Sequence, residues 1–366
     1  MYDIMRNNVG DVWTLTMQPV LIATSGGVDS SVAAWKMKQN GCTCQAATMK
    51  LCEHSNAEDA RQIAQKLEIP FHVFDFTAEF RTCVIDRFVQ IYLEGRTPNP
   101  CVICNRLIKF DRFLRKAEEL GLSFMATGHY AQIEHDSVSS RYLLKKAVDE
   151  TKDQSYVLYS LTQAQLAKVL FPLGTLRKSE VRSIAGSLGF ANAQKQESQD
   201  LCFVPDGDYA SFIEQYIGQS CPAGDFVDKT GKVLGRHKGL IRYTIGQRKG
   251  LGIAAPAPYY VCGHNVKENT VVLGSESDLL VQTVTATDIN FIPFDRIDDS
   301  LRAVVKVRYR QKGDWATVRQ LDSNTLHIEF DEPQKGVAQG QAAVLYDGDY
   351  VVGGGTIVAA NAMSAA

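Results

Sequence analysis

The sequence has no apolar run long enough to cross a membrane and no strong excess of charge of either sign. Its 366 residues carry a formal net charge of −2 at pH 7, with 45% hydrophobic and 22% charged residues. These proportions are those of an ordinary globular chain of two or three domains. Because the overall charge does not attract polyanions, a nucleic-acid partner must be bound by local basic patches. We expect no membrane association.

A secretion signal and a disulfide framework are missing as well. Residues 1–17 lack the basic-then-apolar order of a signal peptide, and we expect a frayed leader there and disorder at 359–366. The nine cysteines are odd in number and scattered. This usage is typical of a reducing compartment, so we expect a cytoplasmic protein whose thiols serve packing or chemistry.

Three common site patterns are absent. No Gly-Lys-Ser/Thr follows the glycines at 26–27, which excludes a Walker loop. A glycine pattern like that of dinucleotide-binding loops occurs at 250–255, but no βαβ unit is predicted around it, so we discard it. The second cysteine pair that a structural zinc ribbon needs is also missing.

What the sequence does contain is a glycine-rich turn, Ser25-Gly26-Gly27-Val28-Asp29-Ser30, which we call the phosphate loop. A buried strand is predicted before it at Pro19–Ala23, and helical periodicity follows it through Met37. The glycines let the backbone approach an anion, and the helix N-terminus faces the same anion. Asp29 is a candidate Mg²⁺ ligand.

This loop resembles the PP-loop of ATP pyrophosphatases, which cleave ATP between the α and β phosphates and adenylate a substrate. The alternative is a glycine turn that only starts a helix. The strand before it, Asp29 and the second serine favour the first interpretation.

The elements after the loop alternate between strands and helices. This order predicts a parallel sheet covered by helices, with ligands at the carboxyl ends of the strands. We expect strands at 43–49, 71–76 and 123–127, a hairpin within 131–148, and helices at 57–67, 78–93, from Asn105 onward, at 163–170 and at 178–188.

The composition shifts near residue 205, where short alternating strands and glycine turns take over after a helix at 209–217. From about 281 to 357 the pattern predicts a small closed β-barrel. We therefore expect an α/β chain with three domains: a PP-loop, Rossmann-like catalytic domain at 1–205, a small β-rich central domain at 206–278 and a C-terminal barrel at 279–358.

Cysteines form the second constellation. Cys101 and Cys104 make a Cys-x-x-Cys at the entrance to a helix, where the helix N-terminus is expected to lower the pKa of a thiol. Alone, this pair is also consistent with half a zinc site, a redox pair or coincidence. Cys202 follows in a polar loop, and the other six cysteines, Cys52 among them, are interpreted as core or incidental. An adenylating loop together with reactive thiols suggests sulfur transfer, with an RNA base as a candidate acceptor.

Over nearly its whole length the chain resembles the tRNA-specific 2-thiouridylase family of MnmA type. The stretches that carry the resemblance are the phosphate loop, Gly95–Pro100 with Cys104-Asn105, Ile108–Phe110, Ala126–Ala131, Lys152–Tyr156, Phe171–Gly174, Ser198–Phe203 and Tyr243–Gly252.

The resemblance implies a fold, an activity and a set of site residues. It implies 2-thiolation of the wobble uridine (U34) in tRNAs for Lys, Glu and Gln, with ATP and Mg²⁺, giving 2-thiouridine, AMP and pyrophosphate. Cys202 carries the persulfide and Cys104 is its catalytic partner, the two ending as a disulfide. The implied ATP contacts are Ala23, Thr24, Ser25, Gly26, Gly27, Val28, Asp29, Ser30, Met49 and Gly128. The implied tRNA contacts are Asn99, Pro100, Cys101, His129, Lys152, Asp153, Gln154, Arg308, Tyr309 and Gln341.

One departure from the family affects the chemistry. Where the best-known members have Asp, this chain has Cys101, which puts the usual general acid/base in doubt. Three cysteines at one site also allow an iron–sulfur cluster that delivers sulfide, as the alternative to a persulfide.

Two rival functions remain open. One is a PP-loop ligase that adds ammonia and needs no cysteine, and the other is an RNA-binding protein with a vestigial loop. For the thiolation hypothesis we expect the tRNA anticodon stem-loop and a sulfur-relay protein as partners, and a monomer.

Overall fold

The computed structural model describes residues 9–11, 18–53, 57–193 and 201–361. Its first region is built on a parallel sheet with the strand order β4-β3-β2-β5-β8. The bounds are β2 Pro19–Ala23, β3 Thr43–Lys50, β4 Phe71–Asp75, β5 Phe124–Ala126 and β8 Val169–Leu170.

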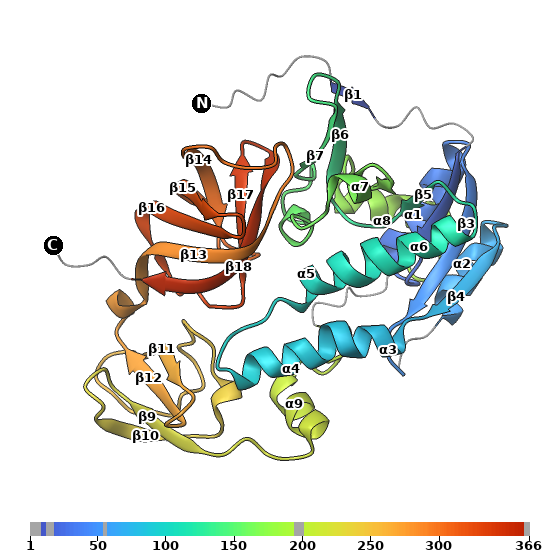
Figure 1. Cartoon of the computed structure of the whole chain (residues 1–366). Helices are drawn as coiled ribbons and strands as arrows, with labels where there is room; N and C mark the ends of the chain where they lie inside the picture. Colours follow the sequence, from blue (N-terminus) through green and yellow to red (C-terminus); the bar gives the residue numbers. More distant parts are fainter. Residues whose placement is uncertain (1–8, 12–17, 54–56, 194–200, 362–366) are drawn as a thin grey trace.

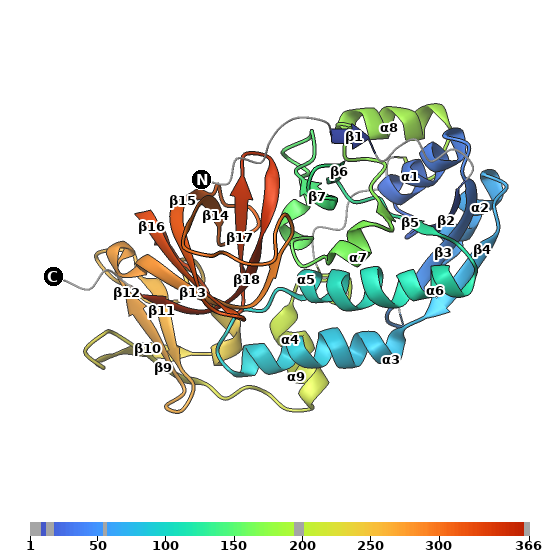
Figure 2. The same ribbon diagram turned by 45° about the horizontal axis from the view of Figure 1, so that its top comes forward.

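Helices cover both faces of this sheet (Figures 1 and 2). Alternation along β2 shows the two layers, because Val20 and Ile22 pack with α1 and α8, whereas Leu21 packs with the two long helices on the other face. The bounds on the first face are α1 Val28–Gln39, α2 Glu58–Lys66 and α8 Lys178–Ser187.

Each long helix on the second face contains a π-helical segment. The first comprises α3 Thr77–Phe80, η1 Arg81–Ile85 and α4 Asp86–Leu93. The second comprises α5 Pro100–Cys104, η2 Asn105–Arg112 and α6 Phe113–Glu119. The prediction that this second helix starts near Asn105 was wrong. It starts at Pro100, because proline is well suited to the first helical position and Asn99 caps the end by accepting from the Val102 N–H.

Three other local expectations need correction. The helix expected at 163–170 ends early, as α7 Gln163–Leu166, because Val169–Leu170 pairs with β5 as strand β8. Within the expected leader, β1 Val9–Asp11 pairs with β6, and the last strand, β18, continues through Asn361. The rest of residues 1–17 and 362–366 lies outside the described residues.

The second half of the chain is β-rich. Helix α9 Tyr209–Ile217 precedes a four-stranded sheet of order β10-β9-β12-β11, with its own small apolar core around Phe226 and Tyr243. Its strands are β9 Gly224–Val227, β10 Val233–His237, β11 Tyr260–Asn265 and β12 Thr270–Gly274. Short 3₁₀ turns are η3 Ser155–Val157, η4 Leu240–Arg242 and η5 Glu276–Leu279.

The last six strands form a closed barrel. The order β18-β13-β16-β15-β14-β17 closes because β17 also pairs with β18. The bounds are β13 Leu280–Phe291, β14 Leu301–Lys306, β15 Asp314–Asp322, β16 Thr325–Lys335, β17 Ala342–Asp347 and β18 Tyr350–Asn361. The expected fold class, a parallel PP-loop sheet followed by a central domain and a barrel, is confirmed.

A hairpin links the first region to the barrel. Strands β6 Gln132–Asp136 and β7 Arg141–Lys145 form the expected hairpin, but β7 pairs with β18, where Tyr350 faces Lys145. The domain boundaries at 205 and 278 stay a prediction. Among the helices that the structure describes, none has the length and apolarity to cross a bilayer.

Candidate active site

The phosphate loop joins β2 to α1 and leaves the start of α1 open. Gly26 has φ +74°, a left-handed conformation that glycine adopts without strain. Gly27 is the N-cap and offers no side chain to the first-turn N–H groups. The Ser30 hydroxyl donates to the Gly27 carbonyl (3.0 Å) and accepts from the Ser25 N–H (3.1 Å). The loop is therefore held in shape by its own serines, while backbone donors face an incoming anion.

Two close approaches require glycine here. A Cβ on Gly26 would lie 2.6 Å from the Asp59 Cβ, at the start of α2. A Cβ on Gly128 would lie 2.8 Å from the Ser30 nitrogen and 2.9 Å from the Asp29 carbonyl carbon. The loop after β5 thus packs directly on the first turn of α1, which is where the sequence placed an ATP contact at Gly128.

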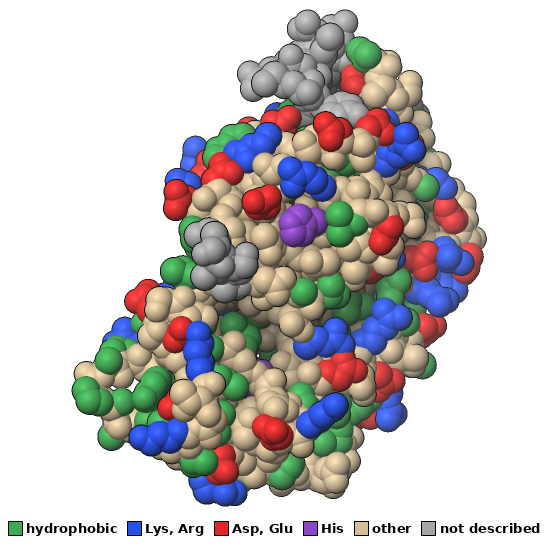
Figure 3. Space-filling model, turned by 60° about the vertical axis from the view of Figure 1, so that its left-hand side comes forward, with side chains coloured by type: hydrophobic (Ala, Val, Ile, Leu, Met, Phe, Trp, Pro, Cys, Tyr) green, Lys and Arg blue, Asp and Glu red, His purple; other side chains and the backbone are tan. Residues whose placement is uncertain are grey.

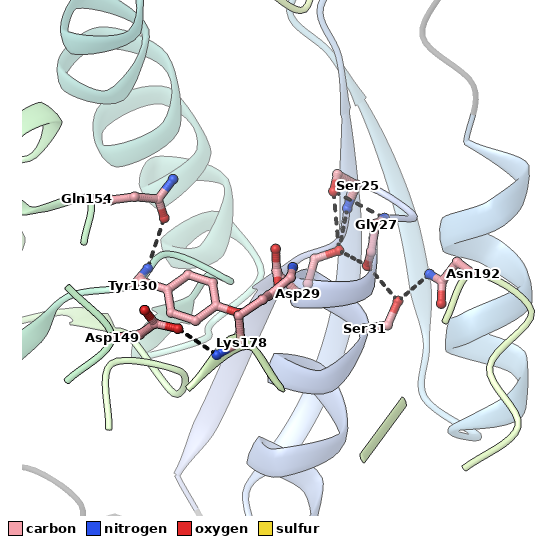
Figure 4. A network of polar contacts seen from close by, with 10 residues as sticks. Ser25, Gly27, Asp29, Ser31, Tyr130, Asp149, Gln154, Lys178 and Asn192 are labelled. Atoms are coloured by element: carbon pink, nitrogen blue, oxygen red, sulfur yellow. Dashed lines mark hydrogen bonds and ion pairs between the residues drawn. The ribbon is translucent and has the colours of Figure 1, made fainter. Parts of the chain in front are cut away.

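Asp29 is already paired within the chain (Figure 4). Its Oδ1 accepts from the Tyr130 hydroxyl at 2.7 Å and from the Lys178 ammonium at 2.6 Å. The Lys178 side chain is only 10% exposed and the Asp29 side chain 31% exposed. Lys178 was not predicted as a site residue. The signal for it was a lysine in the first turn of a helix, where the helix dipole disfavours a cation.

Asn192 is a second residue that the sequence analysis missed. Its amide donates to the Gly26 carbonyl (2.8 Å) and to the Ser31 hydroxyl (2.9 Å), so it fixes the turn from the far side (Figure 4). No local pattern pointed to it. Of the other predicted ATP contacts, Thr24 is buried and bonds the Ala47 carbonyl, and Met49 lies half-buried at the carboxyl end of β3.

The cysteines predicted to act together are neighbours. Cys101 and Cys202 both lie near enough to Cys104 to interact with it electrostatically. Cys104 is buried, and Cys101 and Cys202 are exposed residues. Cys52, interpreted as incidental from the sequence, also lies near enough for its charge to act on Cys202. All four are free thiols. We call Cys101, Cys104 and Cys202 the thiol site.

The expected lowering of the thiol pKa values was wrong. Burial raises the pKa of Cys104 to about 12 and raises the pKa of both Cys101 and Cys202. The reason is desolvation, which acts even on the two residues that are exposed as a whole. The hydration that a thiolate loses there outweighs the electrostatic stabilisation that the helix end provides. At neutral pH all three are thiols unless a cation or a substrate stabilises the charged form.

His129 lies between the thiol site and the phosphate loop. Its ring contacts Phe110 and Phe171, and its Nδ1 shares a 2.8 Å hydrogen bond with the Thr127 hydroxyl. Burial, followed by the charge of Lys109, holds the pKa of His129 well below its usual value. The imidazole is therefore neutral at pH 7 and meets a ligand as a hydrogen-bonding ring rather than as a cation.

Most of the predicted tRNA contacts already hold the chain together. The Gln341 amide donates to the Thr97 and Pro98 carbonyls, which fixes the segment leading into Cys101. The Asp153 carboxylate accepts from the Ser155 hydroxyl at 2.7 Å, and the Gln154 side chain accepts from the Tyr130 N–H at 2.9 Å. These side chains position neighbouring segments of the site.

Two barrel residues were also predicted to contact tRNA. Arg308 donates to the Ile245 carbonyl (2.8 Å) and to the Gly336 carbonyl, which joins the central sheet region to the barrel. Tyr309 is 38% exposed, its hydroxyl donates to the Asp153 carbonyl, and its phenol interacts electrostatically with Cys101. Tyr309 is thus the barrel residue that borders the thiol site.

The two centres differ in how well they suit a metal. Among the described residues no group of three Cys, His, Asp or Glu side chains is arranged to hold a metal ion. Asp29 fits Mg²⁺ better, since Mg²⁺ needs only one or two carboxylates when phosphates supply the other ligands. On the face drawn in Figure 3, basic and acidic side chains are interspersed, in keeping with the near-neutral net charge.

Three family models match the chain in order. They are described as a tRNA methyl transferase HUP domain (residues 18–206), a tRNA methyl transferase PRC-barrel domain (210–275) and an aminomethyltransferase beta-barrel domain (281–357). The first alone covers more than half of the chain.

Relatives of known name match at high identity. The tRNA-specific 2-thiouridylase MnmA of Clostridioides difficile is 48% identical over 351 residues, which is 92% of this chain and 97% of that protein. The enzyme of the same name from Acetivibrio thermocellus is 44% identical over 358 residues, 94% of this chain and all of that protein. A solved 4-thiouridine synthetase–RNA complex with bound ATP is 18% identical, with a TM-score of 0.36 over 55% of this chain and 50% of that one, which is too distant to support an argument.

The close approach at Gly128 gives a first prediction. A methyl group added by Gly128→Ala meets backbone atoms of Asp29 and Ser30, which cannot move aside as a flexible side chain does. The start of α1 must shift, and we expect ATP affinity to fall at least about tenfold by calorimetric titration. Gly186→Ala in α8, where an added Cβ meets nothing within 4 Å, is the control and should bind normally. Normal binding by Gly128→Ala would contradict this geometry.

A second prediction concerns Arg308. Because its guanidinium bonds two carbonyls across a junction, Arg308→Met should lower the free energy of unfolding by about 2 kcal/mol in urea titrations. The exposed neighbour Arg310, changed to Met, should stay within about 0.5 kcal/mol of the parent. Full stability of Arg308→Met with a selective loss of tRNA affinity would show that the side chain acts on RNA instead.

A third prediction follows from thiol burial. A raised pKa means less thiolate at a given pH, and alkylation follows the thiolate. The rate at which iodoacetamide modifies Cys202, followed by mass spectrometry, should therefore keep rising above pH of about 8.5, where an ordinary cysteine is half ionised. A midpoint below about pH 7 would instead indicate a thiolate stabilised by the helix end.

Proposed function

We propose a reaction course for this chain from one premise: it belongs to the tRNA-specific 2-thiouridylase MnmA family, and it is an ATP-dependent tRNA-uridine 2-sulfurtransferase. The substrate is the wobble uridine of tRNAs for Lys, Glu and Gln, and the products are 2-thiouridine, AMP and pyrophosphate. One observation carries the proposal: Cys104 and Cys202, 98 residues apart in the sequence, lie close enough to interact electrostatically in a chain that also carries the phosphate loop.

The first half-reaction takes place at the phosphate loop. Residues Ala23–Ser30, Met49 and Gly128 surround the nucleotide, with the first-turn N–H groups of α1 on the phosphates. Asp29 would hold Mg²⁺, which would neutralise part of the charge of the phosphates. The uridine O2 attacks the α-phosphorus, the bond to the β-phosphate breaks, and pyrophosphate leaves with the electron pair.

The second half-reaction takes place at the thiol site. The terminal sulfur of a Cys202 persulfide attacks C2 of the adenylated base, and the C2–O bond breaks so that AMP leaves. The Cys104 thiolate then attacks the Cys202 sulfur. The bond between the Cys202 sulfur and the sulfur on C2 breaks, and its electron pair stays on the sulfur of C2, which gives 2-thiouridine. A Cys104–Cys202 disulfide forms. A thiol reductant and a persulfide-carrying donor protein complete the cycle.

Cys101 takes part differently from the Asp of other family members. Because burial raises its pKa, Cys101 is a neutral thiol at pH 7. A neutral thiol donates a proton or a weak hydrogen bond, whereas it accepts a proton poorly. We therefore assign Cys101 to contact with the base, together with Asn99 and Pro100, rather than to general base catalysis.

The target base has to leave its stack to reach both centres. Tyr309 and His129 border the site as exposed and half-buried rings, and such rings suit stacking with an unpaired base in the anticodon loop. Lys152 directly precedes Asp153 and Gln154 in the sequence, and we assign it to contact with the tRNA. We propose that the protein acts as a monomer in the cytoplasm.

The fourth prediction separates the two half-reactions. Cys202→Ser and Cys104→Ser should still release pyrophosphate in a tRNA-dependent manner, because the phosphate loop is intact. Both should lose 2-thiouridine formation on the order of 10³-fold, measured by mass spectrometry of digested tRNA. Asp29→Asn should lose both activities, and Cys221→Ser, half-buried and outside the thiol site, should lose neither.

Two outcomes would overturn this assignment. Full activity of Cys104→Ser with an ammonia donor would indicate an amidating ligase. A brown chromophore after anaerobic purification that is lost in Cys101→Ser would favour delivery of sulfide from an iron–sulfur cluster.

A further inference from the structure

Lys109 lies on the same helix as two of the catalytic thiols, within the π-helical segment η2. It follows Cys104 by five residues. In an α-helix a five-residue step turns the side chain by about 140° away from its starting direction. A π-helix closes its hydrogen bonds over five residues, so residue 109 stands nearly above residue 104. The irregular segment therefore brings the lysine onto the face of the helix that carries the thiols.

The charge of Lys109 reaches every member of the thiol site. It opposes the burial that raises the pKa values of Cys101, Cys104 and Cys202. It also acts on His129, which belongs to a different segment of the chain. The charge of Lys109 thus acts on four groups that come from three segments of the chain.

Lys109 has no counter-ion inside the part of the chain that the structure describes. The side chain is half-buried, yet it forms neither an ion pair nor a hydrogen bond with a described residue. Lys178, a lysine at the phosphate loop, is by contrast paired with Asp29 at 2.6 Å. A half-buried lysine that lacks a described partner and acts on three thiols is placed to meet an anion that forms during the reaction.

We propose that Lys109 stabilises the anionic sulfur of the sulfur-transfer step, namely the Cys104 thiolate and the terminal sulfur of the Cys202 persulfide. The inference rests on the proposed function. In that reaction both attacking groups are negatively charged sulfur atoms, and the proton that leaves the Cys104 thiol passes to water. An ammonium beside them favours the charged form of each without taking part in a covalent bond.

The fifth prediction tests the charge of Lys109 without tRNA or ATP. Iodoacetamide modification of the exposed Cys202 is followed by mass spectrometry in Lys109→Met, which keeps the length of the side chain and removes its charge. Near pH 7.5 the rate should fall about tenfold, which corresponds to one charge acting over a few ångströms in a partly wet site. Lys109→Arg, which restores the charge, should return the rate to within about threefold of the parent.

The matched control is Lys116→Met, on α6 of the same helix, where the lysine pairs with Glu119 at 2.6 Å. It should alkylate at the parent rate. Within the described ranges, the other titratable groups that act near the thiols are Cys52, His129 and Tyr309, and these are unchanged in every variant. A parent-like rate in Lys109→Met, or no recovery in Lys109→Arg, would overturn the proposal even if the chain thiolates tRNA normally.

A single-turnover assay then places the effect in the reaction. Lys109→Met should release pyrophosphate with tRNA at the parent rate, while 2-thiouridine formation falls at least about tenfold, because the same charge is lost beside the sulfur anions. An equal loss of both activities would assign Lys109 to folding or ATP binding and would overturn the role in sulfur transfer. Loss of 2-thiouridine in every variant and in the parent would refute the proposed function, whereas the alkylation result would still decide the role of the charge.

Discussion

The close packing of the loop after β5 on the first turn of α1 is the constraint on which the rest of the active site depends. Only glycine fits at residue 128, because backbone atoms of α1 occupy the place of its Cβ. The next residue, His129, is thereby held against Phe110, and Phe110 follows Lys109 on the π-helical segment. Two consecutive residues, Gly128 and His129, thus lie between the phosphate loop and the helix segment that carries Lys109.

Desolvation is the second constraint, and it outweighs the helix end. The thiols lie deep enough for their pKa values to rise, although Cys101 stands in the first turn of a helix. A sulfur that is neutral at rest is protected from oxidation, because the thiolate is the reactive form. The same burial means that sulfur transfer requires an added positive charge or a bound substrate to form the anion.

Local signals were enough to predict the phosphate loop, its strand and helix, and the barrel, because each depends on periodicity and turn residues in short stretches of chain. Contacts between distant segments were not predictable. Lys178 reaches Asp29 across 149 residues, and Asn192 fixes Gly26 across 166 residues. The thiol pKa values were predicted to be lowered, whereas they are raised. The sequence indicates where a helix begins, but it does not show how deeply a side chain is buried. Gln341, whose contact with RNA stays a prediction, also holds the segment before Cys101, and no local pattern pointed to that role.

A thiol at residue 101, where the family resemblance implies Asp, affects the charge balance of the site as well as its acid/base chemistry. A carboxylate at residue 101 would lie within reach of the charge of Lys109, which already acts on the Cys101 thiol, and would offset that charge before any sulfur anion formed. A neutral thiol at the same position leaves that charge to Cys104 and Cys202, whose pKa values burial has raised. The general base that the carboxylate would have provided is lost, and the ammonium compensates by favouring thiolates directly. The neutral thiol at 101 and the lysine at 109, which has no counter-ion among the described residues, therefore act together: the first leaves the charge of the second available to the sulfur anions.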